Sequence, residues 1–208
     1  MSDWRVKTGV ILNVNFNEKD IAKSLGARWS QLLKKWYVPE GPDLSLFDRW
    51  LPDEEGMSYS YALGRLYLVQ ASERCWRCAT STSVYCLASD GFESEGFFCE
   101  NEFTTWGYLN KVPSFLNEHF GQHCPSYFHD YSKKAGGAYC MNHCECGAKL
   151  GDFYLHNEPG GGFFQVCEKQ ARNVIITGVP PCQLGRYLLD ASPGRQFPNL
   201  IFEFGQRR

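Results

Sequence analysis

The sequence Cys75-Trp76-Arg77-Cys78 places two thiols at the spacing of a metal-binding turn. Two thiolates separated by two residues can reach one tetrahedral ion, with zinc–sulfur distances of about 2.3 Å. Cys144-Glu145-Cys146-Gly147 supplies two more thiols, and its glycine suits the left-handed backbone that such turns often require. We therefore predict one structural zinc ion per chain, bound by Cys75, Cys78, Cys144 and Cys146.

The second pair departs from the usual pattern, because only one residue separates its thiols. His143 is therefore an alternative ligand in place of Cys144. Some of the four cysteines could instead be buried thiols, since cysteine packs well as a small apolar residue. A site with four thiolates leaves no position open for water, so we expect it to stabilise the fold and join two distant segments.

Six further cysteines have no compact spacing: Cys86, Cys99, Cys124, Cys140, Cys167 and Cys182. The N-terminus has no apolar signal-peptide core, so we expect a cytoplasmic protein with reduced cysteines. Most of the six are then expected to be buried thiols. The alternative is a second metal site formed by Cys124, Cys140, His123 and His129.

Residues 1–52 predict a small β-α-β-β-α unit that begins with a short apolar strand over 11–16. A helix is expected over 18–25. Asn17 is a suitable N-cap for this helix, and Gly26 is a suitable left-handed residue at its C-terminal end.

Two strands, over 27–29 and 35–38, are expected to follow around a turn. Asp43 can cap a final helix over 44–51, which Pro52 ends.

The remainder predicts a mostly β domain around the zinc site. Residues 53–64 begin with a polar stretch and are expected to be a linker, and the domain is expected to span 65–208. A strand over 65–69 leads to the first cysteine pair, and an insertion at about 87–138 separates the two pairs. Short helices are expected near 113–120 and 168–173. The predicted fold class is α+β, with a small β-α-β-β-α module before a zinc-ribbon-like domain.

The motif Gly26-Ala27-Arg28-Trp29, followed by Lys35-Trp36-Tyr37-Val38, closely resembles a family of small bacterial domains of unknown function, DUF5710. The resemblance covers residues 10–52. The family usually has an acidic residue and a proline after this motif, where Ser30-Gln31-Leu32-Leu33 stands here, so the turn is expected to differ. The remainder is similar to uncharacterised bacterial zinc-ribbon proteins. Because DUF5710 recurs in plasmid primase-like and other mobile-element proteins, the resemblance implies nucleic-acid processing by association.

Arg28, Lys34, Lys35 and Trp36 form a basic and aromatic cluster that predicts contact with nucleic acid. Basic side chains bind phosphates and flat rings stack on bases, a combination suited to single strands. The alternative is that Trp29 and Trp36 fill the core of the small unit and the lysines are merely solvated. The net charge of −2 argues against a uniformly basic binder but not against a local patch.

Sequence motifs for catalysis are absent. Gly160-Gly161-Gly162 is not followed by Lys-Ser/Thr, and no Gly-x-Ser-x-Gly occurs. Asp130, Asp152 and His156 could collect a catalytic metal. However, residues 151–156 predict a strand, on which Asp152 and His156 would lie about 13 Å apart.

We therefore expect a non-catalytic zinc-binding protein of bacterial or mobile-element origin that contacts nucleic acid or a nucleic-acid enzyme. No apolar run is long enough for a membrane span, so no membrane partner is expected. One alternative is a protein-interaction factor in phage–host or mobile-element conflict, with a protein partner. The other is a Cys/His-dependent enzyme.

Overall fold

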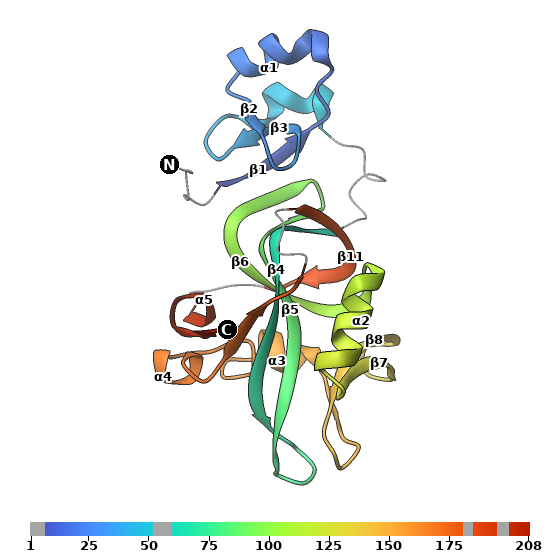
Figure 1. The fold of residues 1–208 in the computed structure, drawn as a ribbon. Helices are drawn as coiled ribbons and strands as arrows, with labels where there is room; N and C mark the ends of the chain where they lie inside the picture. Colours follow the sequence, from blue (N-terminus) through green and yellow to red (C-terminus); the bar gives the residue numbers. More distant parts are fainter. Residues whose placement is uncertain (1–6, 52–59, 181–184, 195–199) are drawn as a thin grey trace.

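A computed structural model describes residues 7–51, 60–180, 185–194 and 200–208, and Figure 1 shows their arrangement. The described part is mostly β, so the expected α+β class is wrong. A large sheet has the order β12-β10-β4-β11-β6-β1-β3-β2, with β5 paired to both β4 and β6. A small sheet has the order β7-β8-β9. The helices are short and surround these sheets.

Long antiparallel strands form the centre of the large sheet: β4 (Ser60–Arg74), β5 (Ser81–Ser94) and β6 (Phe97–Lys111). β11 (Gly185–Pro193) pairs with both β4 and β6. Because β5 also pairs with both, the four strands form a closed ring of antiparallel pairs. Fully buried side chains in the core of this region include Leu87, Trp106 and Leu109.

β4 bends at a bulge around Gly64, where its pairing register with β5 shifts. Gly64 has a φ of +82°, and a Cβ atom there would lie 2.6 Å from the Cβ atom of Asp90. The Asp90 carboxylate accepts hydrogen bonds from the Arg65 N–H at 2.9 Å and from the Tyr67 hydroxyl at 2.7 Å. Since bulges bend a strand and increase its twist, this feature helps the four strands to close.

The N-terminal unit consists of β1 (Lys7–Leu12), the 3-10 helix η1 (Phe16–Glu18), α1 (Lys19–Ser24), β2 (Arg28–Ser30), β3 (Lys35–Pro39) and the 3-10 helix η2 (Leu44–Trp50). Asp43 caps η2 as expected, by accepting a hydrogen bond from the Ser45 N–H at 3.0 Å. Gly26 has the expected left-handed φ, at 107°. The N-cap of α1 is Glu18 rather than Asn17.

The N-terminal unit is continuous with the large sheet. One edge of β1 pairs with β3, and the other pairs with β6. The Tyr37 ring packs edge-on against Phe98, with ring centres 4.7 Å apart, and the Ser30 hydroxyl donates to the buried Glu100 carboxylate. The α+β description fails because these strands extend a larger sheet and the helical segments between them are short.

The small sheet consists of β7 (Tyr127–Ser132), β8 (Gly137–His143) and β9 (Lys149–Leu150). α2 (Ser114–His123) precedes it and α3 (Asp152–Asn157) follows it. The strand expected over 151–156 is therefore wrong, because most of this segment is helical. The remaining elements are α4 (Glu168–Ala171), β10 (Ile175–Gly178), α5 (Leu200–Phe204) and β12 (Gln206–Arg207).

The segment boundaries differ from those expected. Residues 60–64, assigned from the sequence to the linker, are the first residues of β4, whereas 52–59 lie outside the described residues. The expected insertion at about 87–138 contains most of β5 and all of β6, so it supplies central strands. The division into domains 1–52 and 65–208 stays a prediction. None of the helices in the described ranges has the length and apolar character needed to cross a membrane.

Candidate metal centre

The first cysteine pair lies at the tip of the β4–β5 hairpin. The Cys75 N–H donates to the Thr80 carbonyl at 2.9 Å, and the Ala79 N–H donates to the Cys75 carbonyl at 2.9 Å. The Arg77 N–H donates to Cys75 Sγ at 3.4 Å. These main-chain hydrogen bonds hold a tight turn whose thiols point toward the second cysteine pair.

The second cysteine pair lies in the turn between β8 and β9. The Cys144 N–H donates to the Ala148 carbonyl at 2.9 Å, and the Gly147 N–H donates to the Cys144 carbonyl at 2.8 Å. Gly147 has a φ of 78°, the left-handed conformation expected from the sequence. The turn therefore accommodates two thiols separated by one residue.

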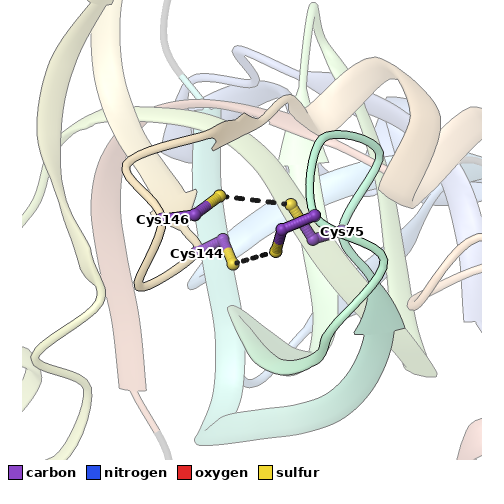
Figure 2. Close-up of side chains that lie close together, drawn as sticks. Cys75, Cys144 and Cys146 are labelled. Carbon is purple, nitrogen blue, oxygen red and sulfur yellow. Dashed lines mark hydrogen bonds between the residues drawn. The ribbon is translucent and has the colours of Figure 1, made fainter.

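The four sulfur atoms all lie within 4.8 Å of one another. In Figure 2 the sulfur atoms of the labelled residues Cys75, Cys144 and Cys146 lie close together. The Sγ atoms of Cys75 and Cys146 are 3.7 Å apart, and those of Cys78 and Cys144 are 3.6 Å apart. In a tetrahedral zinc site with bonds of about 2.3 Å, neighbouring sulfur atoms lie about 3.8 Å apart. The two short separations match the edges of such a tetrahedron, so the four cysteines can hold a metal ion.

Hydrogen bonds favour the thiolate form at the first pair. The Thr80 hydroxyl and N–H lower the pKa of Cys78 to about 6. The Cys78 N–H, followed by that of Arg77, is the main reason that the pKa of Cys75 is also lowered. Hydrogen-bond donors close to sulfur favour the charged form that binds metals. The role of Thr80 was not expected from the sequence, although its position two residues after Cys78 was a signal.

The second pair differs, because the surroundings of Cys144 favour the protonated form. The Cys146 N–H lowers the pKa of Cys144, but burial and hydrogen bonds with the neighbouring thiols raise it to about 12. A divalent cation that displaces the remaining protons would supply the positive charge that four adjacent thiolates need.

The two turns also contact each other through groups other than the thiols. Trp76 Nε1 donates to the Lys149 carbonyl at 3.0 Å, and the Arg77 guanidinium donates to the Cys146 carbonyl at 3.3 Å. Cys75 and Cys144 are buried together with Ala148, whereas the other two thiols are exposed. The site therefore lies at the surface, where the β4–β5 hairpin meets the small sheet.

His143, the alternative ligand, contacts other groups. Its Nε2 atom lies 3.1 Å from Asp130 Oδ2, and its Nδ1 atom lies 3.3 Å from the Ser126 carbonyl oxygen. The ring stacks on Phe128, with ring centres 3.9 Å apart and planes at 3°. His143 is not part of the sulfur cluster, in which Cys144 is present.

The alternative second metal site is not assembled. Among the described residues, the four cysteines are the one group of three or more His, Cys, Asp or Glu side chains close enough together to hold a metal ion. Cys124 and Cys140 are buried in the core, and His129 Nε2 lies 2.8 Å from Asn110 Oδ1. Of the other cysteines, Cys86 and Cys99 are buried and Cys167 is exposed, while Cys182 lies outside the described residues.

The residues expected to contact nucleic acid lie on two faces of the β2–β3 hairpin. Trp36 is opposite Trp29, and their ring centres are 5.8 Å apart. Because neighbouring residues of a strand point to opposite faces, Lys35 faces the other way, with Nζ 3.6 Å from the Glu93 carboxylate. Arg28 lies on the same face as Lys35 by this alternation.

Lys34 lies exposed at the turn between these strands, where its Nζ donates to the Gln31 side chain at 3.3 Å. Trp36 is partly buried against the core of the N-terminal unit. Trp29 keeps 43% of its surface exposed, so it does not fill that core.

Asp152 and His156 are both buried on α3, which sequence reasoning missed by expecting a strand. Asp152 Oδ2 accepts a hydrogen bond from the Tyr108 N–H at 2.7 Å, and Oδ1 has no hydrogen-bond partner among the described residues. Burial raises the pKa of Asp152 to about 7 and lowers that of His156 to about 3. Asp130 pairs instead with Lys149, at 2.7 Å, and these three residues are not grouped as metal ligands among the described residues.

Comparison with known proteins finds similarity over one short part of the chain. Two curated proteins from Escherichia coli, each named "DNA primase TraC", are 54% identical to it over 39 residues. That stretch is 19% of this chain but only 3% and 4% of the two primases, so the chain spans a very small part of their length. No solved structure matches the chain significantly. A family described as "Domain of unknown function (DUF5710)" matches residues 10–52, about a fifth of the chain.

Proposed function

We propose that Cys75, Cys78, Cys144 and Cys146 bind one structural Zn²⁺ ion and that the protein is a non-catalytic zinc-binding protein that contacts nucleic acid. The observation that carries the metal assignment is the separation of 3.6–3.7 Å between paired sulfur atoms. Four thiolates in a tetrahedral arrangement favour Zn²⁺ and leave no coordination position for water or substrate.

The ion would join the tip of the β4–β5 hairpin to the turn between β8 and β9. Those segments are far apart in the sequence and already share the hydrogen bonds from Trp76 and Arg77. A bound ion adds its coordination energy to these contacts only when both turns are in place. Metal binding is therefore coupled to folding of the small sheet against the hairpin.

The metal content of purified protein tests this proposal. Elemental analysis is expected to find one zinc per chain in the wild type and almost none in Cys75→Ser and Cys146→Ser. Cys167→Ser is the matched control, since Cys167 is an exposed thiol outside the cluster. Replacement of zinc by Co²⁺ should give the intense thiolate-to-metal absorption of a tetrahedral site. A zinc ion retained by both test variants would disprove the ligand assignment.

The nucleic-acid partner is supported by exposed groups of the N-terminal unit, together with its similarity to a stretch of two primases. Trp29 is 43% exposed and Phe16 is 78% exposed, with Lys19 Nζ 3.7 Å from the centre of the Phe16 ring. Lys34 is exposed as well. Such aromatic and basic side chains can stack on bases and contact phosphates of a single strand.

Fluorescence anisotropy with a labelled single-stranded oligonucleotide tests this partner. Binding should weaken as salt increases, because phosphate contacts release counterions. Trp29→Ala and Lys34→Glu should weaken it, whereas Lys133→Glu, at an exposed position on the turn after β7, should not. Lys35→Glu is a poor test, since it also removes the contact with Glu93. Absence of binding to DNA and RNA even at low salt would disprove the nucleic-acid assignment.

A further inference from the structure

One edge of β5 is only partly covered by another strand. β4 pairs with β5 as far as Ser81, which lies opposite Arg74. β6 pairs with the other edge of β5 only between Leu87 and Ser94. On that second edge, residues 81–86 therefore have no neighbouring strand among the described residues.

The side chain of Asn142 takes the place of a neighbouring strand at Tyr85. The Tyr85 N–H donates to Asn142 Oδ1 at 2.7 Å, and Asn142 Nδ2 donates to the Tyr85 carbonyl at 2.9 Å. One side-chain amide thus makes the pair of hydrogen bonds that a residue on an adjacent strand would make. Because hydrogen-bonding directions alternate along an antiparallel pair, the main-chain groups of Ser83 and Ser81 point the same way as those of Tyr85.

Ser81 and Ser83 line a groove of about 940 Å³. Their main-chain groups on this side are called the open edge of β5. Residues 80–83 line the groove on the hairpin side, and Ser126 and Phe128 are among its other lining residues. Phe128 is 48% exposed, and its ring stacks on that of His143, which also lines the groove. No other described residue forms a main-chain hydrogen bond with the open edge.

The open edge lacks the usual protection against strand addition. Exposed edges in soluble proteins are commonly blocked by lysine, proline or a bulge, or covered by another segment. Residues 79–84 are Ala-Thr-Ser-Thr-Ser-Val, without charge or proline, and pair with β4 in unbroken register from Ser81 onward. An extended polypeptide presents N–H and C=O groups at the same two-residue repeat of about 6.8 Å and can hydrogen-bond to such an edge.

The charge of the residues that line the groove indicates which class of partner can bind there. Glu145 lines the groove, and no lysine or arginine is among its lining residues. Cys78, Cys144 and Cys146 also line the groove, and a divalent ion bound by four thiolates would keep a net negative charge there, a point that rests on the proposed metal centre. Such a groove favours a basic segment and disfavours a phosphate backbone.

We propose that this groove binds an extended, basic segment of a partner protein, which adds as a further strand to the open edge of β5. Its main chain pairs with Ser81 and Ser83, and one apolar side chain contacts Phe128. This surface is separate from the exposed aromatic groups of the N-terminal unit. The protein thus has a site for a polypeptide in addition to its proposed nucleic-acid contacts.

The test uses the full-length, zinc-loaded protein and a short synthetic peptide of alternating valine and lysine. NMR should show slower amide exchange at Ser81 and Ser83 when the peptide binds. Two further peptides carry N-methyl groups on alternate amides, one on the odd and one on the even positions. The peptide whose methyl groups block the amides that pair with β5 should bind at least about tenfold more weakly than the unmethylated peptide. A peptide with glutamate in place of lysine should also bind more weakly.

Ser83→Pro is the protein variant, because proline there removes the N–H that points into the groove. It also removes the hydroxyl that accepts a hydrogen bond from Gln70 Nε2 at 3.1 Å, so Ser83→Ala is its matched control and should still bind the peptide. Ser83→Pro should abolish peptide binding while zinc content and melting temperature remain close to those of the wild type. If Ser83→Pro fails to fold, Phe128→Ala and the N-methylated peptides still decide the question. The proposal is overturned if no peptide protects Ser81 and Ser83, if a single-stranded oligonucleotide protects them more strongly than the peptide, or if the chain alone dimerises through this edge.

Discussion

Arg186 of β11 holds Glu93 of β5 by two hydrogen bonds, from Nε to Oε2 at 2.6 Å and from Nη2 to Oε1 at 2.7 Å. The Glu93 side chain is only 8% exposed, and Lys35 of β3 lies 3.6 Å from the same carboxylate. The Arg186 guanidinium also lies over the Tyr61 ring, 3.3 Å from its centre. These contacts join the closure of the strand ring to the N-terminal unit.

Glu93→Ala should therefore lower the free energy of unfolding by about 2–3 kcal/mol. Removing one member of a fully buried ion pair costs about 3–5 kcal/mol, and the loss here is smaller because the Arg186 side chain keeps 28% exposure. Urea unfolding followed by tryptophan fluorescence measures the change. Glu40→Ala is the control, since Glu40 is exposed and should matter by less than about 0.5 kcal/mol. Equal losses in the two variants would contradict the role given to Glu93.

Removal of the proposed zinc ion should loosen the two cysteine turns and leave the N-terminal unit intact. With a chelator, amide exchange should accelerate in 74–81 and 143–150 and stay unchanged in 7–51, because only the first two segments carry ligands. Zinc at a free concentration of a hundred times its Kd stabilises the fold by about 2.7 kcal/mol, so the melting temperature should recover when zinc is restored. Exchange rates that do not respond to the chelator would contradict a structural role.

The four-cysteine cluster could be predicted from the sequence because its chemistry is local. Cys75 and Cys78 have the spacing of a tight turn, and Gly147 supplies the conformation that the second turn requires. The caps at Asp43 and Gly26 were also visible, since each depends on a single residue type. The sequence does not show directly that the two cysteine turns lie together. That contact could be predicted only because one tetrahedral ion needs four ligands.

The fold class could not be predicted in the same way, because it depends on strand pairs between distant segments. β1 pairs with β6, and β11 closes the ring between β4 and β6. Nothing in the local pattern of Ser81–Ser94, with its serines, aspartate and glycine, indicates a long central strand. α3 was mistaken for a strand because a short apolar run fits either structure. That the side chains of Lys35 and Trp36 lie on opposite faces of the β2–β3 hairpin could have been predicted, since neighbouring residues of a strand point to opposite faces.

Asp152 and His156 should affect the pH dependence of stability in opposite directions. Burial raises the pKa of Asp152 from 3.8 to about 7, so between these values the folded chain retains a proton that the unfolded chain loses, and stability falls as pH rises. Burial lowers the pKa of His156 from 6.5 to about 3, so between these values the unfolded chain gains a proton that the folded chain excludes, and stability rises with pH.

Single variants should separate the two effects. Asp152→Asn keeps an acceptor for the Tyr108 N–H and removes the buried charge, so it should be about 1–3 kcal/mol more stable than the wild type at pH 8. Its stability should rise more steeply than that of the wild type between pH 4 and 6.5. His156→Gln should have the reverse slope. Urea unfolding at several pH values measures both, with the exposed Asp20→Asn as control. Parallel pH profiles for Asp152→Asn and the wild type would contradict this assignment.

Asn142→Ala should cost about 2–3 kcal/mol of unfolding free energy, although it removes only a small polar side chain. Asn142 is fully buried, and its loss leaves both main-chain groups of Tyr85 without their partners. Asn142→Asp should lower the unfolding free energy even more. It keeps an acceptor for the Tyr85 N–H, but it loses the donor to the Tyr85 carbonyl and buries a carboxyl group. Asn157→Ala, at an exposed position on α3, is the control and should be nearly neutral.

Amide hydrogen exchange at Tyr85 is the readout specific to this role of Asn142. Exchange there should accelerate in both Asn142 variants, and by more than at neighbouring β5 residues that pair with β4. If Tyr85 remains as protected as in the wild type, Asn142 is not the group that completes this edge, and the alternation that directs Ser81 and Ser83 into the groove loses its main support.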